Sequence, residues 1–381
     1  MAGGRRGNGE GSIYQRKSGK WVGQMVVGRT PEGKLKHSYV YGNSRKEVSQ
    51  KLTGSLSDLN KDIFIEPTKI LVSKWINYWL ETYKKNSVTS NTYTRYYTIA
   101  NKWIISNIGG VKLQLLKSSH VQEVYNKMNS EGLSGTSIKH AHIILYQSLN
   151  QAKVDKLISA NPDENTTRPK RNKSSVEVLS IEDEKKLVEY LSNDVYGVGI
   201  KLTLNTGLRL GELLGLKWSD IDFNNKTLSV NKSLSRCIEV VGVGKYNSHI
   251  QLHDVKTNSS IRIIPLLDSD IEMLENYKQN KYISNKHNLL FPSSIGTFMD
   301  PKNYTSKFRQ ILATLDIPII KFHALRHTFA TRALEFNIHP KHVQEILGHS
   351  SISMTLDTYS HILPNQKRNA IEQFGLAKSK L

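Results

Sequence analysis

The 381-residue sequence contains one cysteine, Cys237. A single thiol forms no intramolecular disulfide, and a cysteine-based zinc site is implausible. Long apolar runs are also lacking. No stretch approaches the ~20 apolar residues of a transmembrane helix, and the first residues, MAGGRRGNGEGSIYQ, have no apolar segment like that of a signal peptide. We therefore expect a cytoplasmic protein without a membrane partner.

Acidic residues are scarce relative to basic ones. Asp and Glu total 33 and Lys and Arg total 53, which gives a formal net charge of +20. Such a field attracts polyanions and releases their counterions on binding. Charge alone does not separate a DNA-binding protein from a ribosome-associated or merely basic one. At this length, with 38% apolar residues, the chain can form two or three domains with ordinary cores.

Residues 1–65 are expected to form a small basic module. After a Gly- and Arg-rich arm, the runs SIYQRKSGKWVGQMVVGR and KLKHSYVYG have the pattern of short strands separated by turn residues. A helix is predicted from Ser44, with one buried face formed by Val48, Leu52, Leu56 and Leu59. We therefore predict a three-stranded β-sheet plus a helix. Residues 1–46 hold ten Lys or Arg against two Glu, which suits a sheet face lying in a DNA major groove; a solvated sheet face is the alternative.

Residues 66–162 are expected to be all-helical. Apolar residues recur at helical spacing in the first segment, as at Val72, Trp75, Ile76 and Trp79. Three more helices are predicted over 92–105, 121–128 and 136–158, and their aromatic stripe favours core packing over base stacking.

Residues 163–176 are polar, lack periodicity and have the composition of an interdomain linker. Residues 177–381 mix strand-like and helical runs, so the whole chain is expected to be multidomain and mainly α with small β-sheets.

Two arginine-centred segments stand out in this last domain. Arg209 follows Gly207, which can adopt the positive φ of a turn that few residues tolerate, and a guanidinium there can fork onto two phosphate oxygens. His323 and Arg326 are three residues apart, so they are neighbours on one helix face. Taken singly, each segment is more often a surface charge or a solvated pair than a site.

Three further reactive side chains accompany them. Lys256 is expected near the tip of a hairpin formed by HIQLHDVKT and SIRIIPL, within reach of a leaving oxygen, with Lys245 as a nearby alternative. His349 and Tyr359 follow in LGHSSISMTLDTYSH. The ordered set of arginines, lysine, histidines and a late tyrosine suits a phosphodiester attacked by tyrosine without a metal ion.

These segments resemble those of a known family. TLNTGLRLGELLGLKWSDID (203–222) looks like the first arginine box of the tyrosine recombinases, and HALRHTFATRAL followed by ILGHSSISMTLDTYSH resembles the second box with its nucleophile. The likeness covers essentially residues 177–362. The helical segment before it is similar to the family's core-site-binding domain. The basic N-terminal module resembles the arm-site-binding domain of phage and conjugative-transposon integrases, which distinguishes this chain from the shorter chromosome-dimer resolvases.

The resemblance implies an integrase that cuts and rejoins DNA, without metal, ATP or another cofactor, to integrate and excise a phage genome or a conjugative transposon. It assigns the catalytic roles to Arg209, Lys256, His323, Arg326, His349 and Tyr359, with Glu212 in support.

The implied roles form one reaction. Tyr359 attacks the scissile phosphorus and forms a 3′-phosphotyrosyl bond, while Lys256 protonates the leaving oxygen. The two arginines neutralise the non-bridging oxygens, and Glu212 orients the first of them. His323 and His349 position the phosphate, and His323 is the candidate for carrying the tyrosine proton. Fixed cationic donors stabilise such an anionic transition state better than water does, and covalent catalysis divides the exchange into two easier steps.

The same resemblance implies partners. Double-stranded attachment sites of the core and arm types would be bound by a homotetramer, in which the amphipathic tail around Ile371, Phe374 and Leu376 docks on a neighbouring protomer or on its own chain. An excisionase and a host DNA-bending protein are further candidate partners. Alternative functions are a chromosome-dimer-resolving recombinase, a type IB topoisomerase-like enzyme, and a DNA-binding regulator with a relic site.

Overall fold

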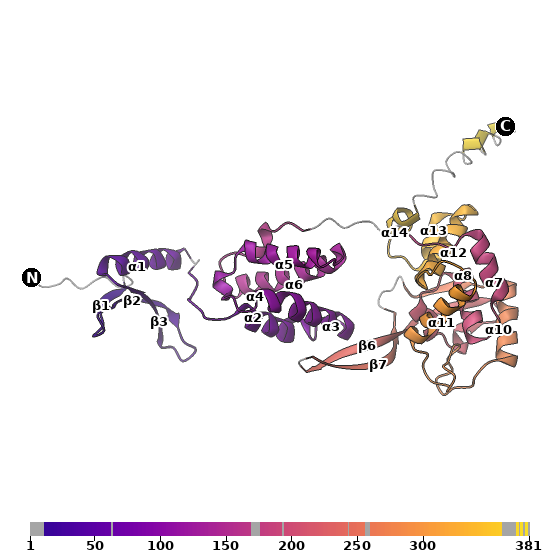
Figure 1. Ribbon diagram of the computed structural model, residues 1–381, viewed down its shortest axis with the longest axis horizontal. Coiled ribbons are helices and arrows are strands. Elements are labelled where there is room, and N and C mark those ends of the chain that lie inside the picture. The colour runs from indigo at the N-terminus through magenta and orange to yellow at the C-terminus, as the bar shows by residue number, and fades with distance from the viewer. Residues whose placement is uncertain are drawn as a thin grey trace, which may run out of the picture. The chain divides into compact units, whose positions relative to one another are not determined.

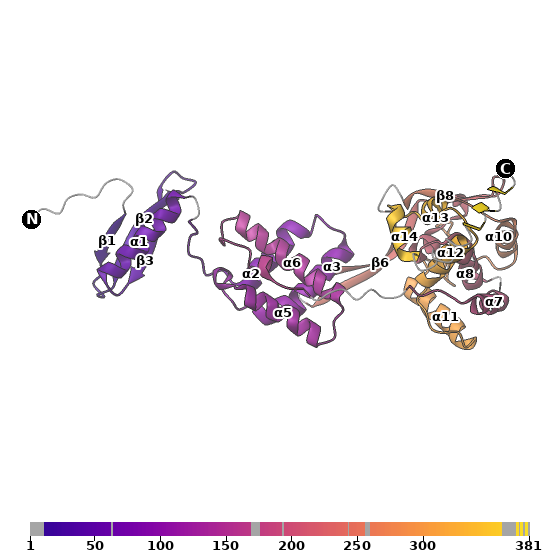
Figure 2. The same ribbon diagram turned by 90° about the horizontal axis from the view of Figure 1, so that it is seen from above.

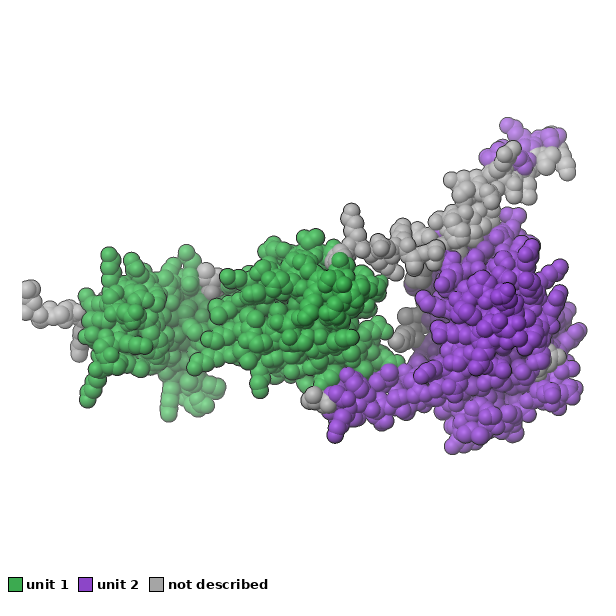
Figure 3. All heavy atoms as spheres, in the orientation of Figure 1, with its two compact units in different colours: residues 1–172 green, residues 173–381 purple. Residues whose placement is uncertain are grey.

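The computed structural model describes residues 11–61, 64–168, 176–192, 194–242, 244–255 and 260–359, and the short stretches 371–372, 374–375 and 378–379. The chain divides into two compact units, residues 1–172 and residues 173–381 (Figure 3). Among the described residues no helix combines the length and the apolar character needed to cross a membrane.

The first unit begins with an antiparallel sheet in the order β1 (Ser12–Gln15), β2 (Trp21–Arg29) and β3 (Leu35–Gly42), with helix α1 (Arg45–Asn60) against it (Figures 1 and 2). Ser44 caps α1 by accepting a hydrogen bond from the backbone N–H of Glu47. Val22 and Met25 of the sheet and Val48 and Leu52 of the helix are buried. The predicted three-stranded sheet with a following helix is therefore confirmed.

A helical module follows in the same unit. Its helices are α2 (Val72–Trp79), which continues into the π-helical turn η1 (Leu80–Lys84); α3 (Ser90–Ile99), which continues through η2 (Ala100–Ile105) into α4 (Ser106–Ile108); α5 (Ser118–Ser130); and α6 (Gly135–Val154) (Figure 1). The four helices predicted for this segment are confirmed. Its aromatic stripe is partly core, since Trp75, Trp79 and Trp103 are buried whereas Tyr78 and Tyr83 are exposed.

The segment predicted as a linker begins with ordered structure. Residues Pro162–Asn165 form a 3-10 turn, η4, against α5 and α6. Asp163 in this turn is 2% exposed and accepts a 2.8 Å hydrogen bond from the hydroxyl of Tyr125. Its other carboxylate oxygen lies 2.8 Å from Nδ1 of His142. The basic stretch 168–173 of this segment lies outside the described residues except for Arg168.

The second unit is a mixed domain in which helices surround a small sheet. The sheet has the order β4 (Ile221–Asp222), β5 (Thr227–Val230) and β8 (Arg262–Pro265). The helices are α7 (Ile181–Tyr190), α8 (Val195–Thr206), α9 (Leu210–Gly215), α10 (Asp268–Asn280), α11 (Pro301–Thr314), α12 (His323–Glu335), α13 (Pro340–Leu347) and α14 (Ile352–Tyr359) (Figure 1). The fold class, mainly α with small β-sheets, is confirmed.

One predicted hairpin is wrong. We expected HIQLHDVKT to pair with SIRIIPL, but β7 (Lys245–Asp254) pairs with β6 (Lys232–Gly242), in a two-stranded ribbon that projects from the body of the unit (Figure 1). Strand β8 pairs instead with β5. The segment after β7 therefore connects two different sheets. Cross-strand partners are chosen by contacts far apart in sequence, which strand-like alternation does not specify.

Candidate active site

The candidate site begins at the turn between α8 and α9. Gly207 ends α8 with a φ of +66°, in the left-handed region that glycine adopts without strain. A Cβ at this position would lie 2.6 Å from Cδ2 of Leu347 and 2.7 Å from Cδ1 of Phe329. The turn thus needs glycine for its conformation and for its close packing, and it places Arg209 directly before α9.

Arg209 is held by a carboxylate. Its backbone N–H donates to Oε2 of Glu212 at 2.9 Å, and its Nη1 donates to Oε1 of the same residue at 2.7 Å. Nη2 of Arg209 lies 3.3 Å from the carbonyl oxygen of Gly348. The Arg209 side chain remains 37% exposed, whereas that of Glu212 is 3% exposed. The expectation that Glu212 orients Arg209 therefore has a direct geometric basis.

A residue that the sequence did not single out completes this network. Arg262, the first residue of β8, donates to both carboxylate oxygens of Glu212, at 2.8 and 3.2 Å. Burial alone would favour a protonated Glu212, but the hydrogen bonds and charge of Arg262, together with Arg209, lower its pKa to about 2. Glu212 is thus ionised near pH 7 and lies between two guanidiniums.

Helix α12 contributes the second arginine. Arg326 is 1% exposed, and its Nη1 donates to the carbonyl oxygen of Gly207 at 2.8 Å. This bond ties α12 to the turn that precedes Arg209. His323 opens α12 one helical turn earlier, and its ring lies 4.6 Å from that of His327, centroid to centroid.

His349 follows α13 and is linked to α14. Its Nδ1 lies 2.8 Å from Oγ1 of Thr355, a fully buried residue. Its carbonyl oxygen accepts a 2.9 Å hydrogen bond from Nε2 of Gln344, which fixes the turn after α13. Sequence reasoning missed Thr355, because a threonine within a helix has no pattern that marks it as a hydrogen-bond partner.

The two site histidines are electrostatically alike. Desolvation, followed by the charges of His327, Arg326 and Arg209, lowers the pKa of His323 to about 4. Desolvation and the charges of Arg326 and Arg209 also lower the pKa of His349 to about 4. Both imidazoles are therefore neutral near pH 7 in the protein without DNA.

The structure brings most of the predicted residues together. Arg209, Glu212, Arg326 and His349 are connected through the hydrogen bonds at Gly207 and Gly348, and His323 lies within electrostatic range of both arginines. Tyr359 is the last residue of α14, one turn after Thr355, and the position of its side chain lies outside the described structure. Lys256 also lies outside the described residues.

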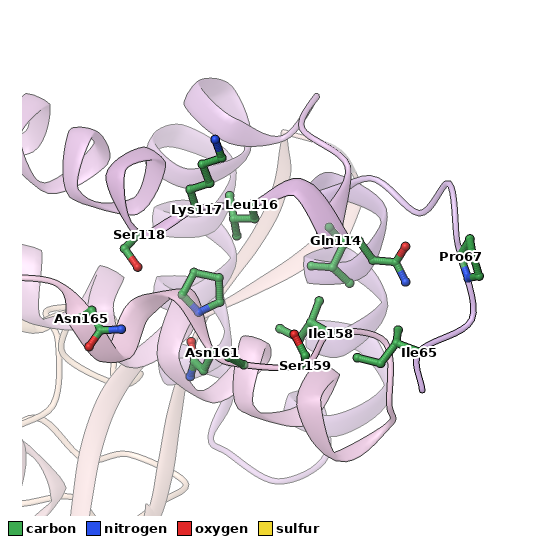
Figure 4. A pocket seen from close by; sticks show the side chains of 13 residues that line it. Ile65, Pro67, Gln114, Leu116, Lys117, Ser118, Ile158, Ser159, Asn161 and Asn165 are labelled. Carbon is green, nitrogen blue, oxygen red and sulfur yellow. The ribbon is translucent and has the colours of Figure 1, made fainter. Parts of the chain in front are cut away.

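A pocket elsewhere in the chain is not part of this site. It lies in the first unit, beside η3 (Leu113–Leu115) and the segment after α6 (Figure 4). Among the described residues that line it, Lys117 is the one with a charge. Gln114 at its edge donates to the carbonyl oxygens of Glu66 and Leu157, so the polar groups there already serve the packing of the module.

The fold brings two arginines and two histidines together, and comparison with known proteins gives the class of protein. The profile of the Phage integrase family matches residues 167–366, and that of the N-terminal SAM-like domain of phage integrases matches residues 71–129. The chain belongs to the phage integrase family of tyrosine recombinases. It is accordingly an enzyme that breaks and rejoins DNA.

Individual relatives agree with this assignment. A protein of Caldanaerobacter subterraneus subsp. tengcongensis named tyrosine recombinase XerC-like is 31% identical over 368 residues, covering 91% of this chain and 94% of its own. The transposase from transposon Tn916 of Enterococcus faecalis is 28% identical over 277 residues, 67% of this chain and 65% of its own. The Tn1549 transposon integrase, solved in complex with transposon right end DNA, is similar with a TM-score of 0.67 and 25% identity, over 80% of this chain and 99% of that one.

Proposed function

We propose that this recombinase is an integrase, which joins a mobile element to a target DNA and releases it again through a 3′-phosphotyrosyl intermediate on Tyr359. The observation that carries the proposal is the network in which Arg209, Arg326 and His349 share the turns at Gly207 and Gly348. Two guanidiniums so placed can donate hydrogen bonds to the non-bridging oxygens of one phosphate. Fixed donors of this kind stabilise charge as it develops without having to reorganise.

The remaining roles follow from position in the chain and from the family. His323 and His349 hydrogen-bond the phosphate, and His323 takes the tyrosine proton. Tyr359 ends α14, the helix whose Thr355 contacts His349, and this connection supports Tyr359 as the nucleophile. Lys256 is the proposed general acid for the 5′-oxygen. Religation to a new 5′-hydroxyl needs no ATP, because the phosphotyrosyl ester retains the bond's energy.

The N-terminal module supports integration over chromosome-dimer resolution or topoisomerase activity. Its sheet exposes Tyr14, Tyr39 and Tyr41, and the guanidinium of Arg16 lies 5.4 Å from the centroid of the Tyr41 ring. Aromatic and basic side chains on one small sheet suit contact with a DNA arm site. The Tn916 and Tn1549 relatives are transposon enzymes by name, which favours a conjugative transposon as the mobile element.

We further propose a homotetramer on DNA, with core and arm sites bound by the two N-terminal modules. In the tail, Ile371 and Phe374 are 71% and 64% exposed, so they are available to a neighbouring protomer. Sedimentation of the protein with and without an attachment-site duplex tests this assembly, and a monomer on saturating DNA would contradict it. An excisionase and a DNA-bending protein remain expected partners.

The test of the nucleophile uses a nicked duplex that traps a covalent adduct. The duplex carries the attachment site identified in the DNA that flanks the gene. We expect Tyr359→Phe to bind this duplex with unchanged affinity and to form no adduct. An adduct that persists in the variant would overturn the assignment of Tyr359.

A second test separates integration from the alternatives. Removing residues 1–65 should leave adduct formation at core sites intact and impair integration between two sites. Unchanged integration would refute the arm-binding role. Relaxation of supercoiled DNA without exchange of strands between duplexes would instead favour a topoisomerase.

A further inference from the structure

Arg262 is buried within the network that holds Arg209. Its side chain is 6% exposed, and its hydrogen bonds go to protein groups. Besides Glu212, it donates from Nε to the carbonyl oxygen of Ile346 at 2.5 Å and from Nη1 to that of Ser260 at 3.2 Å. One guanidinium thus joins α9, the end of α13 and the chain entering β8.

The charges in this network explain why a second arginine is useful. Glu212 accepts from Arg209 and Arg262 on both of its oxygens. A buried pair of Arg209 and Glu212 alone would be neutral, and Arg209 would direct its charge to the carboxylate rather than to a phosphate. With Arg262 the group of three carries a net charge of +1, and Arg209, which is 37% exposed, is the member that can present it.

The contact with Ile346 adds a second consequence. Ile346 lies three residues before His349, in the last turn of α13, and Gly348 in the following turn accepts from Arg209. Arg262 therefore fixes both the carboxylate that orients Arg209 and the helix end that carries His349.

We propose that Arg262 is a positioning residue for DNA cleavage, which balances Glu212 so that Arg209 stays available to the scissile phosphate and which fixes the end of α13 before His349. The inference rests on the proposed function of this site. Arg262 itself does not contact DNA, because its donors are taken by protein groups.

The experiment measures single-turnover adduct formation by the full-length protein on the nicked attachment-site duplex. We expect Arg262→Gln to lower the cleavage rate of the folded protein about ten- to a hundredfold, by analogy with the loss seen when a group that orients a metal ligand is removed. Arg262→Lys, which keeps the charge but not the forked geometry, should recover part of this rate. Thermal unfolding of each variant identifies a loss that is due to misfolding.

Arg332 provides a matched control. Like Arg262, it is a largely buried arginine in ion pairs, with Glu184 at 2.9 Å and with Glu335 at 2.7 Å. It lies on α12, at the opposite end of that helix from His323. Arg332→Gln removes a comparable ion pair and should leave cleavage by the folded protein unchanged. Equal rates in Arg262→Gln and Arg332→Gln would overturn the proposal.

Two readouts separate positioning from mere structural support. If Arg262 acts through Glu212, the double variant Glu212→Gln with Arg262→Gln should be no slower than the slower single variant; multiplied effects would contradict that route. The second readout is the pH dependence of the cleavage rate. The groups that face Glu212 are Arg209, Arg262 and, at longer range, His323, so loss of Arg262 should raise the pKa of Glu212. The cleavage rate of Arg262→Gln should therefore fall at acidic pH, whereas that of Arg262→Lys should not. The Tyr359→Phe measurement on the same duplex tests the underlying function independently.

Discussion

Replacing Gly207 with alanine tests whether the turn between α8 and α9 sets the geometry of the site. The backbone there has a φ of +66°, and the added methyl would lie 2.6 Å from Leu347 and 2.7 Å from Phe329. Neither neighbour can retreat easily, since Leu347 is fully buried and Phe329 packs against the cluster around it. The carbonyl oxygen of Gly207 also accepts the hydrogen bond of the buried Arg326.

The expected loss of stability has two parts. A left-handed conformation costs a residue with a Cβ about 1–2 kcal/mol, and forcing a methyl into a filled core costs about 1–3 kcal/mol. Gly207→Ala should therefore lower the free energy of unfolding of the second unit by about 2–5 kcal/mol. Gly244 is the control, because its φ is +69° and a Cβ added there would meet nothing within 4 Å. Gly244→Ala should show the conformational cost alone.

Hydrogen exchange of peptides from α8 and α12 across a urea series measures the opening free energy of this unit separately from the first. Cleavage of the nicked duplex, measured where the variant is fully folded, reports the second effect. We expect it to fall as well, because movement of the Gly207 carbonyl displaces Arg326. Equal destabilisation in Gly207→Ala and Gly244→Ala would refute the packing argument, and full cleavage activity would refute the link to Arg326.

Three further predictions concern charge and burial. Glu212→Gln leaves two guanidiniums without their anion and should cost about 3–5 kcal/mol of stability, measured by urea unfolding, together with most of the cleavage activity. The pKa of His323 and of His349 is about 4 in the fold, below the usual 6.5, so the stability they confer is present above pH 6.5 and is lost as the pH falls toward 4; unfolding free energies across this window should change less in His349→Asn. Asp163→Asn removes the anion that receives the Tyr125 hydroxyl and should destabilise the helical module by about 1–3 kcal/mol, with exchange in the second unit unchanged.

Local signals in the sequence predicted the elements that local chemistry determines. Ser44 caps the helix predicted to begin there, and the expected left-handed conformation of Gly207 is present. Helix periodicity located α2 and α5 through their buried faces. Each of these features depends on residues within a few positions of one another.

Features that depend on distant partners were not predictable in this way. Strand β7 pairs with β6 in a separate two-stranded ribbon and not with the later strand β8. The sequences of the three strands did not distinguish these two arrangements. Arg262 was missed for a related reason. Strand β8 alternates so that Arg262 and Ile264 point inward and Ile263 is 67% exposed, an orientation that makes sense only once Glu212, fifty residues earlier, is placed beside it.

A phosphate bound at the site would alter the electrostatics of the two histidines. In the free protein, burial and the charges of Arg326 and Arg209 keep His323 and His349 neutral, while Glu212 is the carboxylate that offsets Arg209 and Arg262. A phosphate placed between Arg326 and Arg209 would cancel their repulsion of a proton and add an attraction of its own, so it would raise the pKa of both histidines. If His323 takes the proton from Tyr359, its capacity to do so therefore arises in the DNA complex. A site built this way couples the activation of the nucleophile to the presence of the phosphate that it attacks.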